Sequence, residues 1–140
     1  MKKLMTEAIN AMNNAYVPYS KFRVGASLLL KNGEIITGCN VENASYGLCN
    51  CAERTALFRA YALGYRKDDI IAMSVAGATD GPISPCGACR QVMAELLERD
   101  TPVVLANLKG DTKELTVESL LPYMFSDLKW LNLILTNQDL

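Results

Sequence analysis

The chain has 140 residues, of which 50% are hydrophobic and 21% are charged, and this length is enough to bury a core in one compact domain. Glycine and proline, at 9 and 5 residues, are too few for a disordered or collagen-like chain. The 14 basic and 15 acidic residues give a net charge of −1 and form no basic stripe, which argues against nucleic acid as a partner. We therefore expect a single globular domain over residues 1–140.

Three features of the sequence indicate the cellular compartment of the protein. Residues 1–17 contain two lysines, but Thr6, Glu7 and three asparagines interrupt the apolar centre that a signal peptide needs. No apolar run in the sequence approaches the length that crosses a membrane. The five cysteines are an odd number, which suits thiols that stay reduced. We expect a cytoplasmic protein without a membrane partner.

The first part of the chain predicts a helix followed by a β-hairpin. Apolar residues between positions 4 and 16 recur at three- and four-residue spacings, which predicts an amphipathic helix that Pro18 ends. Residues 22–30 and 34–41 are β-rich, and the Asn32-Gly33 pair between them supplies the positive φ of a tight turn. These two strands should pair in antiparallel fashion.

The middle of the chain alternates helices and strands. Residues 52–63 predict a helix rich in Ala and Leu, and Gly64 behind it suits a left-handed C-terminal cap. Residues 70–78 form a nearly continuous apolar run, typical of a strand covered on both faces. Helical spacing returns over residues 88–98, and residues 102–108 predict a further strand. This strand–helix–strand order favours a parallel crossover.

The last predicted elements complete the fold class. A turn at residues 109–111 is followed by a short helix over 116–125, which Pro122 breaks. The order of elements predicts an α/β fold in which a mixed sheet is sandwiched between helices, with a parallel crossover in its second half. In such sheets ligand sites lie where strands end and helices begin, and both cysteine-rich segments lie at such junctions.

Three of the five cysteines are spaced to hold one metal ion. Cys86 and Cys89 are separated by two residues at the expected start of a helix, so both thiols would lie on one helical face. Cys51, with Asn50 as the helix cap, would lie at the N-terminus of the helix over 52–63, where the helix dipole favours a thiolate. The chain has no histidine, so a metal site must use cysteine or carboxylate.

Zinc is the metal that this set of ligands favours, at one ion per chain. It binds thiolates, whereas calcium and magnesium need oxygen ligands that these segments lack. Three protein ligands leave a fourth position open, which is typical of a catalytic zinc site that activates water. Glu53 follows Cys51 by two residues and is assigned the proton transfers. Arg54 is expected to donate hydrogen bonds to ligand sulfurs and to offset their negative charge.

Spacing alone leaves two other functions open for these cysteines. Cys86 and Cys89 could form a redox dithiol, and Cys49 could join the three expected ligands in a closed four-cysteine structural site. The closed site would have no open coordination position for water, so Glu53 would have no proton to transfer. The alternative to an enzyme is thus a zinc-stabilised module without catalytic activity. Cys39 and Cys49 are otherwise expected to be small buried hydrophobic residues.

Two segments carry a resemblance to a known family. The chain resembles the small zinc-dependent cytidine deaminases of nucleoside salvage in two segments. They are NVENASYGLCNCAERTAL, which starts at Asn40, and SPCGACRQVMAEL, which starts at Ser84. In lacking histidine, the chain resembles the branch of that family in which a CAE segment replaces HAE. The resemblance extends from YVPYSKFRVGA near the start to LLPYMF near the end, so it covers most of the chain.

The family resemblance implies both a fold and a reaction. The fold would be cytidine deaminase-like, a three-layer α/β/α sandwich with a mixed, roughly five-stranded sheet. The reaction would be hydrolytic deamination of cytidine and 2′-deoxycytidine to uridine and 2′-deoxyuridine plus ammonia, in which a zinc-bound hydroxide attacks C4 of the base. Glu53 would move protons to N3 and to the departing amine.

The resemblance also implies substrate contacts by position. Asn40 and Glu42 would hold the ribose 3′-hydroxyl, and Phe22 would pack against the nucleoside. The Ala52 backbone would meet the base, and the Ser84 carbonyl would accept a hydrogen bond from the amine. A relative that deaminates another cytosine nucleoside, such as blasticidin S, would share the zinc site, but the NVEN segment argues for plain ribose.

The family's assembly is implied in the same way. Small members are homotetramers whose sites are completed by neighbouring subunits, so Tyr46 and Phe125 would reach a ribose and a base across the interfaces. The segment after Phe125 matches no functional motif.

Overall fold

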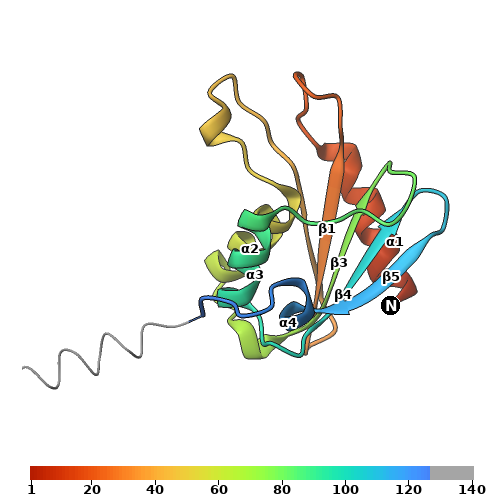
Figure 1. Cartoon of the computed structure of the whole chain (residues 1–140). Helices are drawn as coiled ribbons and strands as arrows, with labels where there is room; N and C mark the ends of the chain where they lie inside the picture. The colour runs from red at the N-terminus through yellow and green to blue at the C-terminus, as the bar shows by residue number, and fades with distance from the viewer. Residues whose placement is uncertain (127–140) are drawn as a thin grey trace, which may run out of the picture.

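The computed structural model describes residues 1–126, and Figure 1 shows a twisted sheet with helices on both faces. The strands of this part of the chain are β1 (Val24–Leu30), β2 (Ile35–Cys39), β3 (Ile70–Gly77), β4 (Pro102–Asn107) and β5 (Thr112–Thr116). The α-helices are α1 (Lys2–Ala11), α2 (Ala52–Ala62), α3 (Gly87–Leu96) and α4 (Val117–Leu120). Short 3-10 turns occur at Met12–Asn14, Tyr46–Leu48 and Lys67–Asp69.

The five strands form one mixed sheet in the order β2-β1-β3-β4-β5. Strand β1 pairs in antiparallel fashion with both β2 and β3, and β4 pairs in the same way with β5. Strands β3 and β4 are parallel, and α3 forms the crossover between them. The predicted hairpin, the parallel crossover and the mixed five-stranded sheet are all confirmed.

The helices form two layers, one on each face of the sheet (Figure 1). Two glycines of the sheet allow the helices to approach closely. A Cβ at Gly25 would meet the carbonyl oxygen of Ala8 in α1. A Cβ at Gly38 would meet the backbone nitrogen of Ala56 in α2, so α2 packs directly on β2, on the opposite face of the sheet. The predicted three-layer sandwich is therefore confirmed.

The larger hydrophobic core lies between the sheet and the layer of α2 and α3. It contains Leu28 and Val75 from the sheet, Leu57 from α2, and Met93 and Leu97 from the α3 region, none more than 1% exposed. Burial of each such aliphatic side chain stabilises the fold by about 1.5–3 kcal/mol. This packing fixes the position of α2 relative to α3, and the N-termini of these two helices carry the cysteines.

The structure corrects the end of the chain. The sequence predicted a helix over 116–125, whereas the structure has an additional strand at Thr112–Thr116 and only a short helix at Val117–Leu120. Strand β5 is an edge strand whose residues are mostly exposed, so it lacks the apolar pattern that marks a strand in the sequence. The first helix also ends earlier than predicted, at Ala11, and continues as a 3-10 turn.

Within residues 1–126, none of the helices combines the length and the apolar composition that are needed to cross a membrane.

Candidate metal centre and active site

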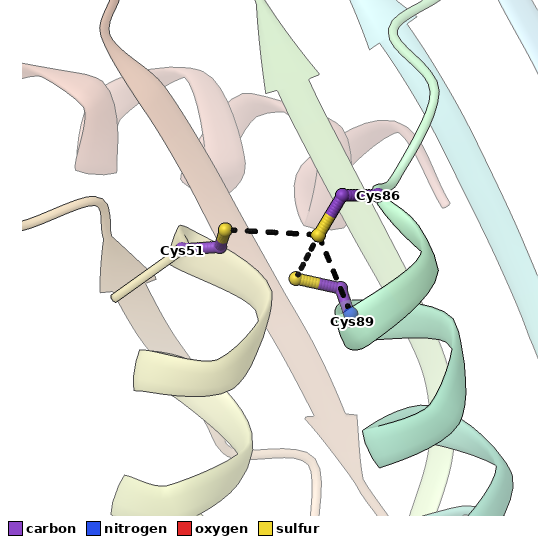
Figure 2. A group of neighbouring side chains, drawn as sticks. All are labelled: Cys51, Cys86 and Cys89. Carbon is purple, nitrogen blue, oxygen red and sulfur yellow. Dashed lines mark hydrogen bonds between the residues drawn. The ribbon is translucent and has the colours of Figure 1, made fainter. Parts of the chain in front are cut away.

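The N-termini of α2 and α3 lie side by side and present three sulfur atoms to one point (Figure 2). Cys51 is the N-cap residue of α2, and Cys86 is the N-cap residue of α3. Cys89 lies in the first turn of α3, and its backbone N–H donates to the Cys86 sulfur at 3.4 Å. Both helix dipoles therefore direct their positive ends at the cluster, which favours thiolates there.

The spacing of the three sulfurs suits one tetrahedral metal ion. The Sγ atoms of Cys51 and Cys86 are 3.9 Å apart, those of Cys86 and Cys89 are 3.3 Å apart, and all three lie within 4.8 Å of one another. Sulfurs that share a tetrahedral zinc with bonds of about 2.3 Å would be separated by roughly 3.8 Å. The donor set is sulfur only, which suits zinc and excludes the oxygen-binding ions calcium and magnesium.

Cys49 does not belong to this cluster. Its sulfur accepts a hydrogen bond from the Asn43 backbone N–H at 3.3 Å and faces the Asn43 carbonyl at 3.5 Å. It is also half-buried, as is Cys39, so neither is the fully buried hydrophobic residue that we expected. The structure thus gives no support to a closed four-cysteine site.

Arg54 compensates for the negative charge of the sulfur cluster. Its Nη2 donates to the Cys51 sulfur at 3.3 Å. A hydrogen bond from Cys89, followed by that from Arg54, lowers the pKa of Cys51 to about 5. The hydrogen bond between Cys89 and the Cys51 sulfur raises the pKa of Cys89. One thiolate is therefore formed readily, and a divalent cation would stabilise the others.

Glu53 is a buried carboxyl group beside the cysteines. It is only 4% exposed, in the first turn of α2. Burial raises the pKa of Glu53, and the negative charge of Cys51 raises it as well. A carboxyl group whose pKa is raised towards neutrality exchanges protons more readily at physiological pH, which suits a general acid and base.

A cavity of about 360 Å³ opens onto the cysteine cluster, within the range of roughly 300–1,000 Å³ that small-molecule sites occupy. Its lining consists of Phe22, Val24, Asn40, Cys51, Ala52, Glu53, Thr79, Ile83, Ser84 and Cys86. The cavity thus brings Phe22, Asn40, Ala52 and Ser84, four of the seven expected substrate-binding residues, together with Glu53. These residues come from distant parts of the chain, so the sheet and its two covering helices build the site.

The amide of Asn40 holds the two ends of a strand pair together. Its Oδ1 accepts from the Val24 backbone N–H at 2.9 Å, and its Nδ2 donates to the Phe22 carbonyl at 2.8 Å. Asn40 therefore orients Phe22 and Val24 at the rim of the cavity. Its amide is thus engaged on both sides.

Three expected substrate-binding residues do not line this cavity. The Oε1 atom of Glu42 accepts from the backbone N–H groups of Tyr19 and Ser20, both at 3.1 Å. Hydrogen bonds from Ser20, first from its side chain and then from its backbone, lower the pKa of Glu42. Tyr46 is 79% exposed and Phe125 is 60% exposed, so most of each residue's surface is left uncovered by the described part of the chain.

Sequence reasoning missed three residues of the cavity wall. Val24, Thr79 and Ile83 line it, and none of them was assigned a role from the sequence. Ile83 had the clearest available signal, because it is a single apolar residue in the polar loop that leads directly to Cys86. Asn50 was wrongly expected to cap α2. Its backbone instead pairs with Val41 in a β-bridge, which leaves the N-cap position to the next residue.

Comparison with known proteins decides the family. Residues 1–105 match the model of the cytidine and deoxycytidylate deaminase zinc-binding region. The chain belongs to this family. The cytidine deaminase of Halalkalibacterium halodurans is 60% identical over 123 residues, which are 88% of this chain and 92% of that protein. The cytidine deaminase of Sporosarcina psychrophila is 54% identical over 126 residues, 90% of this chain and 91% of that protein.

A solved structure of the family shares the fold. The 1.6 Å crystal structure of cytidine deaminase from Burkholderia pseudomallei matches with a TM-score of 0.87 and 55% sequence identity, covering 89% of this chain and 98% of that one. Membership of the family confirms the resemblance that the two cysteine-rich segments carry. It identifies zinc as the cofactor, which the sulfur cluster could hold, and it favours an enzyme over a redox dithiol or a module without activity.

Proposed function

We propose that this family member hydrolyses cytidine and 2′-deoxycytidine to uridine and 2′-deoxyuridine, with release of ammonia, as part of pyrimidine salvage. The observation that carries the proposal is the buried Glu53 carboxyl beside a three-sulfur cluster at the wall of a cavity of suitable size. Relatives that are 60% and 54% identical and are named cytidine deaminases support the same reaction. A blasticidin S deaminase is less favoured because those relatives act on cytidine by name.

The chemistry combines a metal ion with one carboxyl group. Cys51, Cys86 and Cys89 would hold zinc, which when bound supplies a Lewis acid that makes water nucleophilic at neutral pH. Glu53 takes a proton from the attacking water and delivers it to N3 of the base. It then transfers the second proton to the departing amine, so that one water is consumed and one ammonia leaves.

The remaining contacts would orient the nucleoside. Phe22 would pack against it, and the Ala52 backbone and the Ser84 carbonyl would bind the base and its amine. Asn40 and Glu42 would hold the ribose 3′-hydroxyl. The ionised state that its hydrogen bonds favour makes Glu42 a strong acceptor for such a hydroxyl.

We also propose that the whole chain forms one catalytic domain and works in the cytoplasm. The five cysteines are free thiols, as a reducing compartment requires. Neither nucleic acid nor a membrane is a proposed partner, since the net charge of −1 offers little attraction for phosphates.

The direct test is turnover of the purified protein. Cytidine, 2′-deoxycytidine and blasticidin S are each incubated with it, and the ultraviolet change to a uracil chromophore is followed. We expect conversion of the first two substrates, and loss of that conversion after chelation. Turnover of blasticidin S alone would support the alternative substrate, and absence of all turnover in zinc-loaded protein would reject the proposal.

Arg54→Ala should lower turnover or zinc affinity about 10- to 100-fold, the usual effect of losing a partner of a metal ligand. The reason is that Arg54 donates directly to the Cys51 sulfur. Arg59→Ala is the matched control, because Arg59 lies on the same helix but donates to the Thr37 carbonyl. Steady-state kinetics and zinc titration measure both variants. Unchanged zinc binding and turnover in Arg54→Ala would exclude the role.

We further propose a homotetramer in which Tyr46 and Phe125 complete the sites of neighbouring subunits. The exposed rings of Tyr46 and Phe125 support this, because they are free to contact a neighbouring subunit. Sedimentation should give four times the mass of one chain. Phe125→Ala should lower kcat/KM by up to about tenfold, as expected when a packed aromatic contact is lost.

Mixed oligomers of Phe125→Ala and Glu53→Gln chains test whether Phe125 acts across an interface. In such oligomers a Glu53→Gln subunit supplies an intact Phe125 to a site that retains Glu53. Activity above the mean of the two separate variants is therefore expected. Activity equal to that mean would show that Phe125 acts within its own chain or not at all.

A further inference from the structure

The loop between β3 and α3 forms one wall of the cavity. Residues 78–86 have neither helix nor strand, yet they contribute Thr79, Ile83, Ser84 and Cys86 to the lining. A loop without regular backbone pairing needs other contacts to keep its lining residues in place. The side chains that supply these contacts therefore influence the shape of the cavity.

Asn107 supplies the contacts at the start of this loop. It is the last residue of β4, lies opposite Gly77 at the end of β3, and is only 2% exposed. Its Nδ2 donates to the carbonyl oxygens of Thr79 and Asp80, both at 3.0 Å. A buried asparagine that bonds two successive loop carbonyls fixes the backbone path of that loop.

The same side chain is held rigidly by the turn that follows β4. Its Oδ1 accepts from the backbone N–H groups of Lys109 at 3.0 Å and Asp111 at 2.9 Å. Its Nδ2 also donates to Asp111 Oδ2 at 2.8 Å. Asn107 thus joins the turn between β4 and β5 to the wall of the cavity, and its own position is fixed.

The end of the loop has a separate anchor. Arg90 of α3 donates through Nε to the Pro85 carbonyl at 2.9 Å and through Nη2 to the Ser84 hydroxyl at 2.7 Å. The part of the loop next to Cys86 is therefore held by Arg90. The part around Thr79 is held by the buried Asn107, together with an exposed ion pair between Lys109 and Asp80 at 3.1 Å. Loss of one anchor leaves the other in place.

We propose that Asn107 is a positioning residue for substrate binding, which acts by fixing the Thr79 part of the cavity wall. The inference rests on the proposed deaminase function. The side-chain hydrogen bonds of Asn107 go to the loop and to the turn after β4, and not to α2 or α3, which carry the cysteines and Glu53. Loss of its contacts to the loop should therefore raise KM and leave kcat nearly unchanged.

The isosteric variant Asn107→Asp tests this most directly. It keeps the oxygen that accepts from Lys109 and Asp111, but it replaces the amide donor with an oxygen that faces the two loop carbonyls and the Asp111 carboxylate. We expect KM for cytidine to rise about tenfold, as when two ordinary hydrogen bonds are lost, with kcat within about twofold of the unsubstituted protein. Zinc content should stay the same, and amide hydrogen exchange over residues 78–83 should become faster.

Two control variants separate this role from a general loss of stability. Asp111→Asn keeps an acceptor for the Asn107 amide, so KM should change by less than about twofold. Ser74→Ala removes a buried hydroxyl of β3 that donates to the Val104 carbonyl, without touching the loop. It should lower the unfolding temperature but leave KM unchanged. Asn107→Ser removes the donor without placing a charge beside Asp111, so it is measured together with Asn107→Asp and should raise KM in the same way.

The outcomes are distinct. A rise in KM and faster loop exchange in the Asn107 variant, with neither in the two controls, supports the proposal. An unchanged KM, a fall in kcat alone, or an equal rise in KM for Ser74→Ala overturns it. If the unsubstituted protein does not deaminate cytidine, the proposed function fails, whereas hydrogen exchange over residues 78–83 still decides whether Asn107 fixes the loop.

Discussion

Replacement of Glu53 by glutamine is expected to lower kcat by about 100- to 10,000-fold, the usual contribution of a general acid–base group. The amide has nearly the same shape as the carboxyl group, so the packing at the start of α2 should be kept. It can neither take a proton from water nor deliver one to the base. Zinc should remain bound at one ion per chain, because Glu53 is not among the three clustered sulfur ligands.

Steady-state kinetics with cytidine, together with elemental analysis of the same sample, measures both parts of this expectation. Glu95→Gln is the matched control, because it replaces the same carboxyl group by the same amide at an exposed position of α3. Its kcat should stay within about twofold of the unsubstituted protein, as for most surface substitutions. Intact turnover in zinc-loaded Glu53→Gln would contradict the proton-transfer role.

The central part of the fold could be predicted because its burial is visible in the sequence. Strand β3 is covered on both faces, and residues 70–78 accordingly form a nearly continuous apolar run. Strand β5 could not be predicted in the same way. It lies at the edge of the sheet and exposes most of its side chains, so its pairing with β4 leaves no periodic apolar pattern.

The end of the first helix depends on a contact that is distant in sequence. The predicted helix reached residue 16, but the α-helix ends at Ala11 and a 3-10 turn follows. There Arg23 donates through Nη1 to the carbonyl oxygens of Met12, Asn13 and Ala15. Arg23 thus satisfies carbonyls at and just beyond the end of the helix, one of which, that of Met12, also accepts from the Ala15 backbone N–H, and no local pattern predicts these contacts.

The candidate site shows the same division between local and distant information. The Cys86 and Cys89 pair could be predicted from spacing alone, because both lie within one turn of the same helix. The approach of Cys51 required the order of strands in the sheet, which the sequence does not show directly. The cavity wall at Thr79 depends on Asn107, which lies 28 positions further along the chain and contacts it only in the folded state.

The roles of the exposed aromatic residues could not be predicted from the sequence or the fold of one chain. Tyr46 and Phe125 entered the prediction through the family resemblance alone, and in the described residues they contribute nothing to the cavity. If they act across interfaces, their role depends on subunit packing. Neither the periodicity of one sequence nor the fold of one chain contains that information.

Cys86→Ala is expected to abolish zinc binding and to reduce deamination to the background rate, whereas Cys49→Ala should change neither. The two cysteines form a matched pair, because each sulfur accepts one backbone N–H, from Cys89 at 3.4 Å and from Asn43 at 3.3 Å. Only the Cys86 sulfur lies in the three-sulfur cluster. Two remaining thiolates bind zinc too weakly to keep it, so less than about a tenth of an ion per chain should be found.

Elemental analysis and turnover distinguish the catalytic site from a closed one. A catalytic site keeps one coordination position for water, so removal of Cys49 leaves it intact. A closed four-cysteine site would instead lose zinc in Cys49→Ala, and such a result would reject the open site together with the proposed reaction. Chelation of the unsubstituted protein should reproduce the Cys86→Ala result, with activity restored by added zinc only where all three ligands remain. Failure of zinc to restore the chelated protein would contradict this account of its cofactor.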